Sequence, residues 1–175
     1  EVVSSEKPSF AKESIEQKAR DVAKQVEIYL NAYPDKTLED LQNDSVFQQI
    51  AVQPVGKTGY TAISDYDNLV VLFHPTNSLI GTKIEDLSKD YPQLWRIMLR
   101  AQGGTDTSGT YYFPDLTGVV REKYTYIAII DTKTADGVGL WVAATTYLDE
   151  YEEKTVLEKK ETKSTNQYLW IIAIV

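Results

Sequence analysis

The chain of 175 residues contains no cysteine and only one histidine, His74. The lack of cysteine excludes a disulfide framework, a thiolate zinc site and a cysteine nucleophile. One histidine cannot form a two-histidine metal site, and a serine triad would have to recruit this one imidazole. The sequence has no Gly-x-Ser-x-Gly motif, and we identify no catalytic residues, metal ligands or cofactor motif. We therefore expect a domain that is not an enzyme.

Basic residues are also scarce, because 18 Lys and Arg stand against 26 Asp and Glu and give a net charge of −8. A nucleic-acid surface needs a basic stripe that neutralises phosphates, so nucleic acid is excluded as a partner. Hydrophobic residues make up 42% and charged residues 25% of the chain, as in ordinary globular proteins. The length suits one domain with a full core.

An unbroken apolar run covers only the last eight residues, 168–175. Eight residues cannot cross a bilayer, which requires about 20. We interpret the run as the start of a truncated transmembrane helix with Tyr168 and Trp170 at the interface, and a final buried strand is the alternative. The sequence starts without Met or a signal peptide, so we expect it to be a piece of a longer protein.

Helical periodicity dominates the first third of the sequence. Apolar residues spaced by three or four predict an amphipathic helix over residues 9–33, ended by Pro34. Such a stripe packs on the sheet of its own domain or, less often, on a twin helix in a homodimer. A second helix is expected over residues 37–50, with Thr37 as its cap. The stripe consists of Ile15, Ala19, Val22, Val26, Tyr29 and Tyr33.

Strand patterns follow from residue 59 onward. We predict five strands, over residues 59–64, 69–74, 109–113, 119–130 and 139–147. The first two form a hairpin, and its turn explains Asp65 and Asp67 better than a calcium site. The strand over 119–130 is apolar on both faces and should be central. Short helices are expected at 84–87 and 92–102. Without regular alternation of strands and helices, the fold class is α+β with a mostly antiparallel sheet.

A stretch over residues 51–58 has a loose likeness to a phosphate-binding loop. Such a loop follows a strand and opens a helix, whose N-terminus holds the phosphate. Here the predicted helix precedes the stretch and a strand follows it, and Pro54 removes one backbone amide. We therefore reject nucleotide binding.

Cationic and aromatic residues gather in the second half of the sequence. In a chain of net negative charge, this pattern indicates a pocket for an anion, and an arginine fork suits a carboxylate. The alternative is a solvated cationic edge over a tyrosine-rich core. The residues are Trp95, Arg96, Arg100, Tyr111, Tyr112, Arg121, Lys123, Tyr124 and Tyr126.

Several segments between residues 55 and 150 resemble, in the same order, the Cache superfamily of extracellular sensor domains found in prokaryotic histidine kinases and chemoreceptors. They are Val-Gly-Lys-Thr-Gly-Tyr-Thr at 55–61, Leu-Phe-His-Pro at 72–75 with Gly81, Ser-Gly-Thr-Tyr at 108–111, Glu-Lys-Tyr-Thr-Tyr at 122–126, and Leu-Trp-Val-Ala-Ala-Thr-Thr-Tyr-Leu-Asp-Glu at 140–150. The length fits one module, so the chain resembles a single-Cache receptor.

This resemblance implies a PAS-like five-stranded antiparallel sheet, a long N-terminal helix and helices in the connection between the second and third strands. The implied parts are the helix over 1–36, the sensor core over 37–150, and an exit helix with the start of a membrane helix over 151–175. The ligand lies between the sheet and that connection. The implied pocket residues are Tyr60, His74, Trp95, Arg96, Tyr111, Lys123 and Tyr126.

From these observations we expect the extracytoplasmic sensor domain of a membrane receptor, with a histidine kinase as the first choice of output. Its partner would be a small organic ligand, with a carboxylate favoured. The family's amino-acid signature, an Arg followed by Trp-Tyr, is absent, which argues against amino acids. No cofactor is expected. The alternative is a ligand-free module that joins two receptor chains through the stripe of the first helix.

Overall fold

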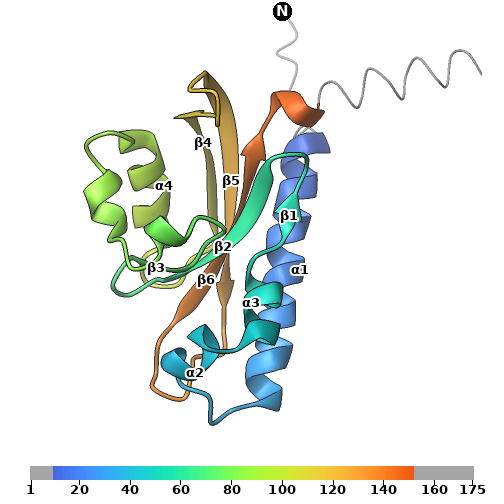
Figure 1. Cartoon of the computed structure of the whole chain (residues 1–175), viewed down its shortest axis with the longest axis vertical. Helices are drawn as coiled ribbons and strands as arrows, with labels where there is room; N and C mark the ends of the chain where they lie inside the picture. The colour runs from blue at the N-terminus through green and yellow to red at the C-terminus, as the bar shows by residue number, and fades with distance from the viewer. Residues whose placement is uncertain (1–9, 152–175) are drawn as a thin grey trace, which may run out of the picture.

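The computed structural model describes residues 10–151, which form one α+β domain (Figure 1). A long helix comes first, a helical segment separates the third strand from the fourth, and three long strands end the domain. In chain order the helices are α1 (Phe10–Ala32), α2 (Leu38–Gln42), α3 (Ser45–Ala51), the 3-10 helices η1 (Asn77–Leu79) and η2 (Ile84–Leu87), and α4 (Pro92–Ala101). The strands are β1 (Pro54–Val55), β2 (Gly59–Asp65), β3 (Val70–Phe73), β4 (Thr107–Pro114), β5 (Val120–Ile130) and β6 (Leu140–Tyr147).

Helix α1 follows the predicted apolar stripe closely. It ends at Ala32, two residues before Pro34, because proline cannot supply the amide that a continuing helix needs. Ile15, Val22 and Val26 are fully buried and pack against β5 and β6 of the same chain. The stripe therefore serves the domain's own core, and the prediction that it could join two chains is wrong for these buried residues.

The predicted single helix over residues 37–50 is in fact two short helices, α2 and α3. Thr37 caps α2 as expected, with a reciprocal hydrogen bond between its backbone amide and the side chain of Asp40. The break comes at Asp44, whose carboxylate accepts the amides of Val46 and Phe47 and so begins α3. The sequence analysis overlooked this second capping residue.

The sheet is antiparallel throughout, with the order β1-β2-β6-β5-β4, and β3 pairs with the same strand as β1, namely β2. The five predicted strands and the hairpin of β2 and β3 are confirmed. The structure adds the two-residue strand β1. Strand β5 is interior, but the middle position belongs to β6, all eight residues of which are buried. The antiparallel α+β class and PAS-like arrangement predicted from the sequence are confirmed.

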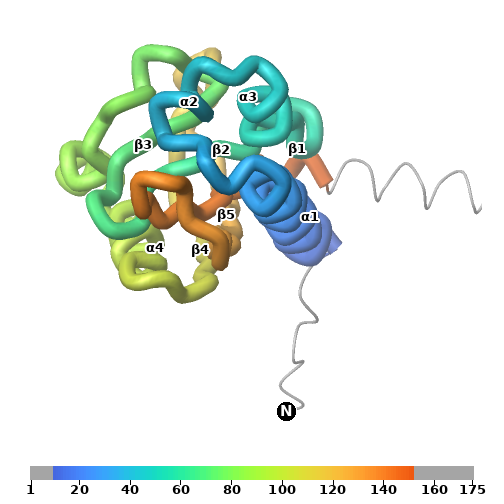
Figure 2. Tube along the Cα trace, turned by 90° about the horizontal axis from the view of Figure 1, so that it is seen from below, coloured from blue at the N-terminus to red at the C-terminus, as the bar shows by residue number. Residues whose placement is uncertain are grey.

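Two cores lie on opposite faces of the sheet. Helix α1 covers one face, with α3 beside it, and η2 and α4 cover the other, as Figures 1 and 2 show. The second core contains Leu94 and Ile97 of α4 together with Ile127, Trp141 and Ala143 of the sheet. The connection from β3 to β4 thus forms a cover over one face, as the resemblance implied.

The chain beyond β6 turns into a helix at Asp149. The rest of the predicted exit helix and the apolar run over 168–175 lie outside the described residues, and the proposed domain boundaries stay predictions. No helix within residues 10–151 is both long and apolar enough to cross a membrane.

Candidate ligand-binding site

A cavity of about 240 Å³ lies between the sheet and its cover of η2 and α4. Every sheet strand except β1 contributes to it, and the cover closes it from the other side. No Asp, Glu, Lys or Arg is among its lining residues, so its wall is apolar and aromatic with a few hydroxyls. These residues are Tyr60, Ala62, Ser64, Val71, His74, Leu79, Thr82, Ile84, Leu87, Tyr91, Leu94, Met98, Tyr111, Phe113, Thr125, Ala143 and Thr145.

Lys123 lies beside this cavity, on the same face of the sheet. It pairs with Tyr111 of β4 and Tyr147 of β6, and directly opposed residues share a face. Its Nζ lies 4.7 Å from the ring centre of Tyr60 and 5.4 Å from that of Phe113, and both rings line the cavity. The side chain is only 3% exposed. A positive charge is therefore held in a nearly dry aromatic surrounding.

The direct neighbours of the Lys123 ammonium are aromatic rings, and Glu150 attracts it without forming a salt bridge. Within residues 10–151 it makes no hydrogen bond or salt bridge, and its third ring contact is Tyr147 at 5.0 Å. Burial lowers the pKa of Lys123 from 10.5 to about 8, and the attraction of Glu150 opposes that decrease. Buried charges in proteins are normally paired. A carboxylate ligand would supply the missing partner.

His74 and Tyr60 form one end of the cavity, with their rings edge to face at 4.7 Å. The imidazole Nδ1 accepts the backbone amide of Thr76 at 2.9 Å, so the neutral ring carries its proton on Nε2. Burial, and then the charge of Lys123, lower the pKa of His74. Burial also raises the pKa of Tyr60 to about 12. At neutral pH both groups are uncharged donors.

Tyr111 is fixed at the floor of the cavity by a chain of hydroxyls. Its hydroxyl lies 3.0 Å from Thr145 Oγ1, and Thr145 in turn donates to the carbonyl of Tyr124 at 2.9 Å. Because Thr145 has only one hydroxyl proton, Tyr111 must donate to it. Burial raises the pKa of Tyr111 well above its usual value. Tyr111 retains acceptor capacity for a ligand donor.

Four of the seven predicted site residues come together here: Tyr60, His74, Tyr111 and Lys123. Tyr126 does not join them. Tyr126 is three residues after Lys123 in β5, and residues three apart in a strand point to opposite faces of the sheet. Tyr126 therefore lies on the face that α1 covers. There it contacts Arg20 and donates to Asp106 at 3.3 Å.

The predicted site residues of α4, Trp95 and Arg96, do not line the cavity either. Leu94 and Ile97 of α4 face the sheet, which leaves Arg96 exposed. Trp95 lines a separate shallow pocket with Lys83 and residues 68–70. The sequence grouping therefore failed for Trp95 and Arg96 because helix rotation, unlike spacing along the chain, decides which side chains reach the cavity.

The sequence analysis missed several cavity residues that the strand period could have indicated. Thr125 is two residues from Lys123, and Phe113 is two residues from Tyr111, so each shares a face with a predicted site residue. Tyr91 and Met98 belong to the cover, and no simple pattern in the sequence distinguishes them from core residues.

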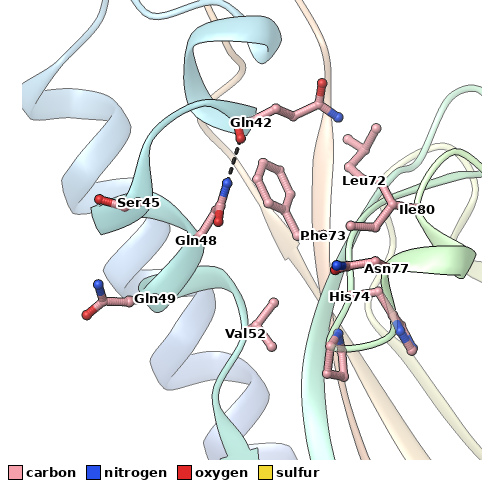
Figure 3. Close-up of a pocket in the computed structure, with 11 residues that line it drawn as sticks. Gln42, Ser45, Gln48, Gln49, Val52, Leu72, Phe73, His74, Asn77 and Ile80 are labelled. Atoms are coloured by element: carbon pink, nitrogen blue, oxygen red, sulfur yellow. Dashed lines mark hydrogen bonds between the residues drawn. The ribbon is translucent and has the colours of Figure 1, made fainter.

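A larger and more open groove of about 730 Å³ lies between α3 and the segment from β3 to η1 (Figure 3). Amide side chains gather along it, and Gln48 Nε2 donates to the carbonyl of Gln42 at 2.6 Å. The labelled His74 ring in Figure 3 points away from this groove. The groove has no charged lining residue and no buried cation, so the smaller cavity is the better candidate.

The stretch that has a likeness to a phosphate-binding loop does hold an anion, but one from the same chain. The backbone amides of Lys57 and Thr58 donate to Glu150 Oε2 at 2.9 and 3.3 Å. Thr146 Oγ1 donates to the same oxygen at 2.8 Å, and the Thr58 hydroxyl donates to Oε1. Although burial alone would raise it, these hydrogen bonds lower the pKa of Glu150. The loop therefore fixes the start of the exit helix.

Metal binding finds no support in the part of the chain that the structure describes. No group of three or more His, Cys, Asp and Glu side chains comes together there. The Asp65 carboxylate instead accepts the amides of Asp67 and Asn68 and closes the hairpin turn.

Comparison with known proteins found no matching family model and no matching curated protein. Several solved structures are similar. They include the LOV domain of the blue-light photoreceptor Aureochrome1 in its light state, with a TM-score of 0.39, 14% identity, and coverage of 58% of this chain and 90% of that one. A LOV domain studied with a flavin analogue gives a TM-score of 0.36 and 15% identity, and covers 61% of this chain and 89% of that one.

The ligand-binding domain of the Pseudomonas aeruginosa amino-acid chemoreceptor PctB, solved in complex with L-Arg, is also similar. Its TM-score is 0.42 at 16% identity, over 79% of this chain. This chain spans about half of that domain, 47% of its length. The similar solved structures thus include light-sensing and ligand-binding domains.

Proposed function

We propose that this chain is the extracytoplasmic sensor domain of a membrane signalling receptor and that it binds a small organic anion in the cavity beside Lys123. A histidine kinase is our first choice of output. The resemblance to Cache sensors supports the receptor context. The single observation that carries the ligand proposal is the buried ammonium of Lys123, which makes no salt bridge or hydrogen bond within the described residues.

The shape of the cavity limits the ligand. A volume of about 240 Å³ corresponds to roughly eight water molecules, so the ligand has on the order of ten non-hydrogen atoms or fewer. One end offers Lys123, with Tyr60 and His74 as nearby donors, and the rest is mostly apolar with a few hydroxyls. A carboxylate at that end would gain charge-assisted hydrogen bonds of about 1.5–3 kcal/mol each. The remainder of the ligand would be apolar.

The test is thermal unfolding of the chain with a panel of small carboxylates at millimolar concentration. Each acid is paired with its neutral amide, for example butyrate with butyramide, so that the pair has nearly the same size and shape but differs in charge. We expect at least one acid, and not its amide, to raise the melting temperature. At 100 times the dissociation constant the stabilisation is about 2.7 kcal/mol.

Two variants complete the test. Lys123→Met should abolish the response to the acid, whereas Arg96→Ala should keep it, because Arg96 is exposed on the outside of the cover. A response that survives in Lys123→Met would refute the anion site. If the acid and its amide raise the melting temperature of the parent protein equally, the anion site is refuted and the domain is a sensor for neutral ligands.

The alternative of a ligand-free dimerisation module loses its main support in the structure. Four residues of the stripe proposed to join two chains, Ile15, Ala19, Val22 and Val26, are buried in the domain's own core, where α1 packs against β5 and β6. On the outer side of α1, the exposed positions between residues 13 and 25 are polar or charged. The exposed large apolar or aromatic residues, Phe10, Ile28 and Tyr33, lie toward the two ends of the helix.

A further inference from the structure

The turn between β4 and β5 presents apolar side chains to solvent. Leu116 is fully exposed at 104%, and Val119 and Val120 are 57% and 63% exposed. Single exposed apolar residues are common on protein surfaces, but three within five positions at the tip of a hairpin mark a candidate contact surface. We call residues 115–120 the hairpin tip.

Four backbone amides of the hairpin tip have hydrogen-bond acceptors within the tip itself. The Asp115 amide donates to the Val119 carbonyl, and the Gly118 amide to the Asp115 carbonyl, both at 2.9 Å. Asp115 Oδ1 accepts the amides of Thr117 and Val119 at 2.9 and 3.1 Å, and the Thr117 hydroxyl at 2.6 Å. These hydrogen bonds lower the cost of moving the tip from water into the interfacial region of a lipid layer, because the four amides would not lose a water partner.

The one acidic side chain of the tip, Asp115, has a basic partner. Arg121 Nη1 lies 3.5 Å from Asp115 Oδ2, and the same guanidinium pairs with Asp149. These three groups close a charge network at the base of the tip. Leu116, Val119 and Val120 themselves lie beyond it. Because the tip is apolar and its one acid is paired, it suits a lipid surface. The tip has no free basic residue to attract anionic headgroups, and a chain of net charge −8 would be repelled by them.

The hairpin tip lies at the end of the domain where both connections to the rest of the chain emerge. Strand β5 starts there and pairs with the end of β6 through Lys123 and Tyr147, two residues before the exit helix begins. Helix α1 starts at the same end, where the Phe10 ring contacts Tyr151 with centres 6.3 Å apart. In Figure 1 the β4–β5 turn, the start of α1 and the exit from β6 share the upper end.

We propose that the hairpin tip inserts its apolar side chains into the outer layer of the bilayer that holds the receptor. The inference rests on the proposed membrane tether, because the tether would bring this end of the domain to the lipid surface. The inserted tip would form a second membrane contact beside the exit helix and would fix the orientation of the domain on the bilayer.

The absence of cysteine makes a site-specific test clean. Leu116→Cys is labelled with the environment-sensitive fluorophore NBD, and Asp35→Cys, an exposed position after the far end of α1, is the matched control. The full chain carries a C-terminal hexahistidine tag that binds nickel-chelating lipid in phosphatidylcholine vesicles, so it reaches the membrane whether or not its own sequence tethers it. Unchanged melting temperatures verify the fold of both labelled variants.

We expect the probe at position 116 to shift to shorter emission wavelengths and to be quenched by lipid-borne quenchers, and the probe at 35 to do neither. A probe at 116 that stays water-like on tagged vesicles overturns the insertion. A blue shift without vesicles that grows with protein concentration also overturns it, since a second copy then covers the tip. Dependence on added phosphatidylglycerol would likewise contradict an apolar contact. Imidazole, which displaces the hexahistidine tag from nickel, tests the tether separately. Release of the chain from the vesicles would contradict the proposed membrane tether and would leave the insertion of the tip to the fluorescence result.

Discussion

Replacing Lys123 by methionine should make the ligand-free domain more stable. The pKa of this ammonium falls from 10.5 to about 8 through burial, which corresponds to roughly 3 kcal/mol against the charged form in the folded state at neutral pH. The three ring contacts offset about 1.5 kcal/mol of this penalty, at about 0.5 kcal/mol each. Methionine has a similar length, carries no charge and packs well against aromatic rings. We expect a net gain of about 1–2 kcal/mol.

The assay is reversible thermal or urea unfolding at pH 7 without added acid. For a chain of this size, 1 kcal/mol corresponds to about 2–4 °C in melting temperature. A stable variant that has lost the response to acids would show that Lys123 is kept for binding at a cost in stability. A Lys123→Met variant less stable than the parent by 2 kcal/mol or more would refute the reasoning, because the ammonium would then have a stabilising partner inside the domain.

Three other outcomes follow from particular contacts. Between pH 8 and 10.5 the unfolded Lys123 holds a proton that the folded one has released, so the stability of the parent relative to Lys123→Met should rise with pH in that window, as urea midpoints would reveal. Gly59→Ala should cost about 3 kcal/mol or more, because its new Cβ would lie 2.2 Å from the Thr145 carbonyl oxygen, whereas Gly118→Ala meets open space and should cost only about 1–2 kcal/mol of backbone strain. Val22→Asp should unfold the monomer, since it places an unpaired charge in the core under α1, and a variant that melts like the parent would contradict this packing.

The sequence was a good guide to elements whose pattern repeats over several turns or strand pairs. The three- and four-residue spacing predicted α1 to within a residue at each end, and strand alternation predicted β5 and β6. It failed where one side chain decides the outcome. Asp44 divides a helix that periodicity alone would continue, and the two-residue strand β1 is too short to produce a pattern.

The candidate site was predictable only on the strands. Tyr60, Tyr111 and Lys123 could be grouped because strand residues of one face are known once the register is known. Arg96 could not be placed, because its direction depends on how α4 rotates over the sheet, and the buried contact of Ile97 with Gly109 decides that rotation. The contact of the Glu150 carboxylate with the loop before β2 could not be predicted from the sequence either, since Glu150 lies 92 residues after Thr58.

The position of Glu150 connects the cavity with the exit helix. Thr145 of β6 bonds to Tyr111 at the cavity floor, and the next residue, Thr146, donates to Glu150. The negative charge of Glu150 attracts Lys123 and raises its pKa against the effect of burial. A bound carboxylate would compete for the same ammonium. Ligand binding should therefore weaken the attraction that helps to hold the exit helix, and by reciprocity Glu150 should weaken ligand binding.

Glu150→Gln tests this connection. The amide keeps one acceptor for the loop but has no charge, so we expect a stability loss of about 1–3 kcal/mol. We also expect affinity for the stabilising acid to increase by roughly three- to tenfold, from the loss of like-charge repulsion. Titration calorimetry at pH 6 keeps Lys123 protonated in both proteins. Glu122→Gln is the control, because Glu122 is an exposed acid on the same strand as Lys123 and points to the opposite face. Equal affinities of Glu150→Gln and Glu122→Gln would mean that the exit helix does not sense the ligand through this charge.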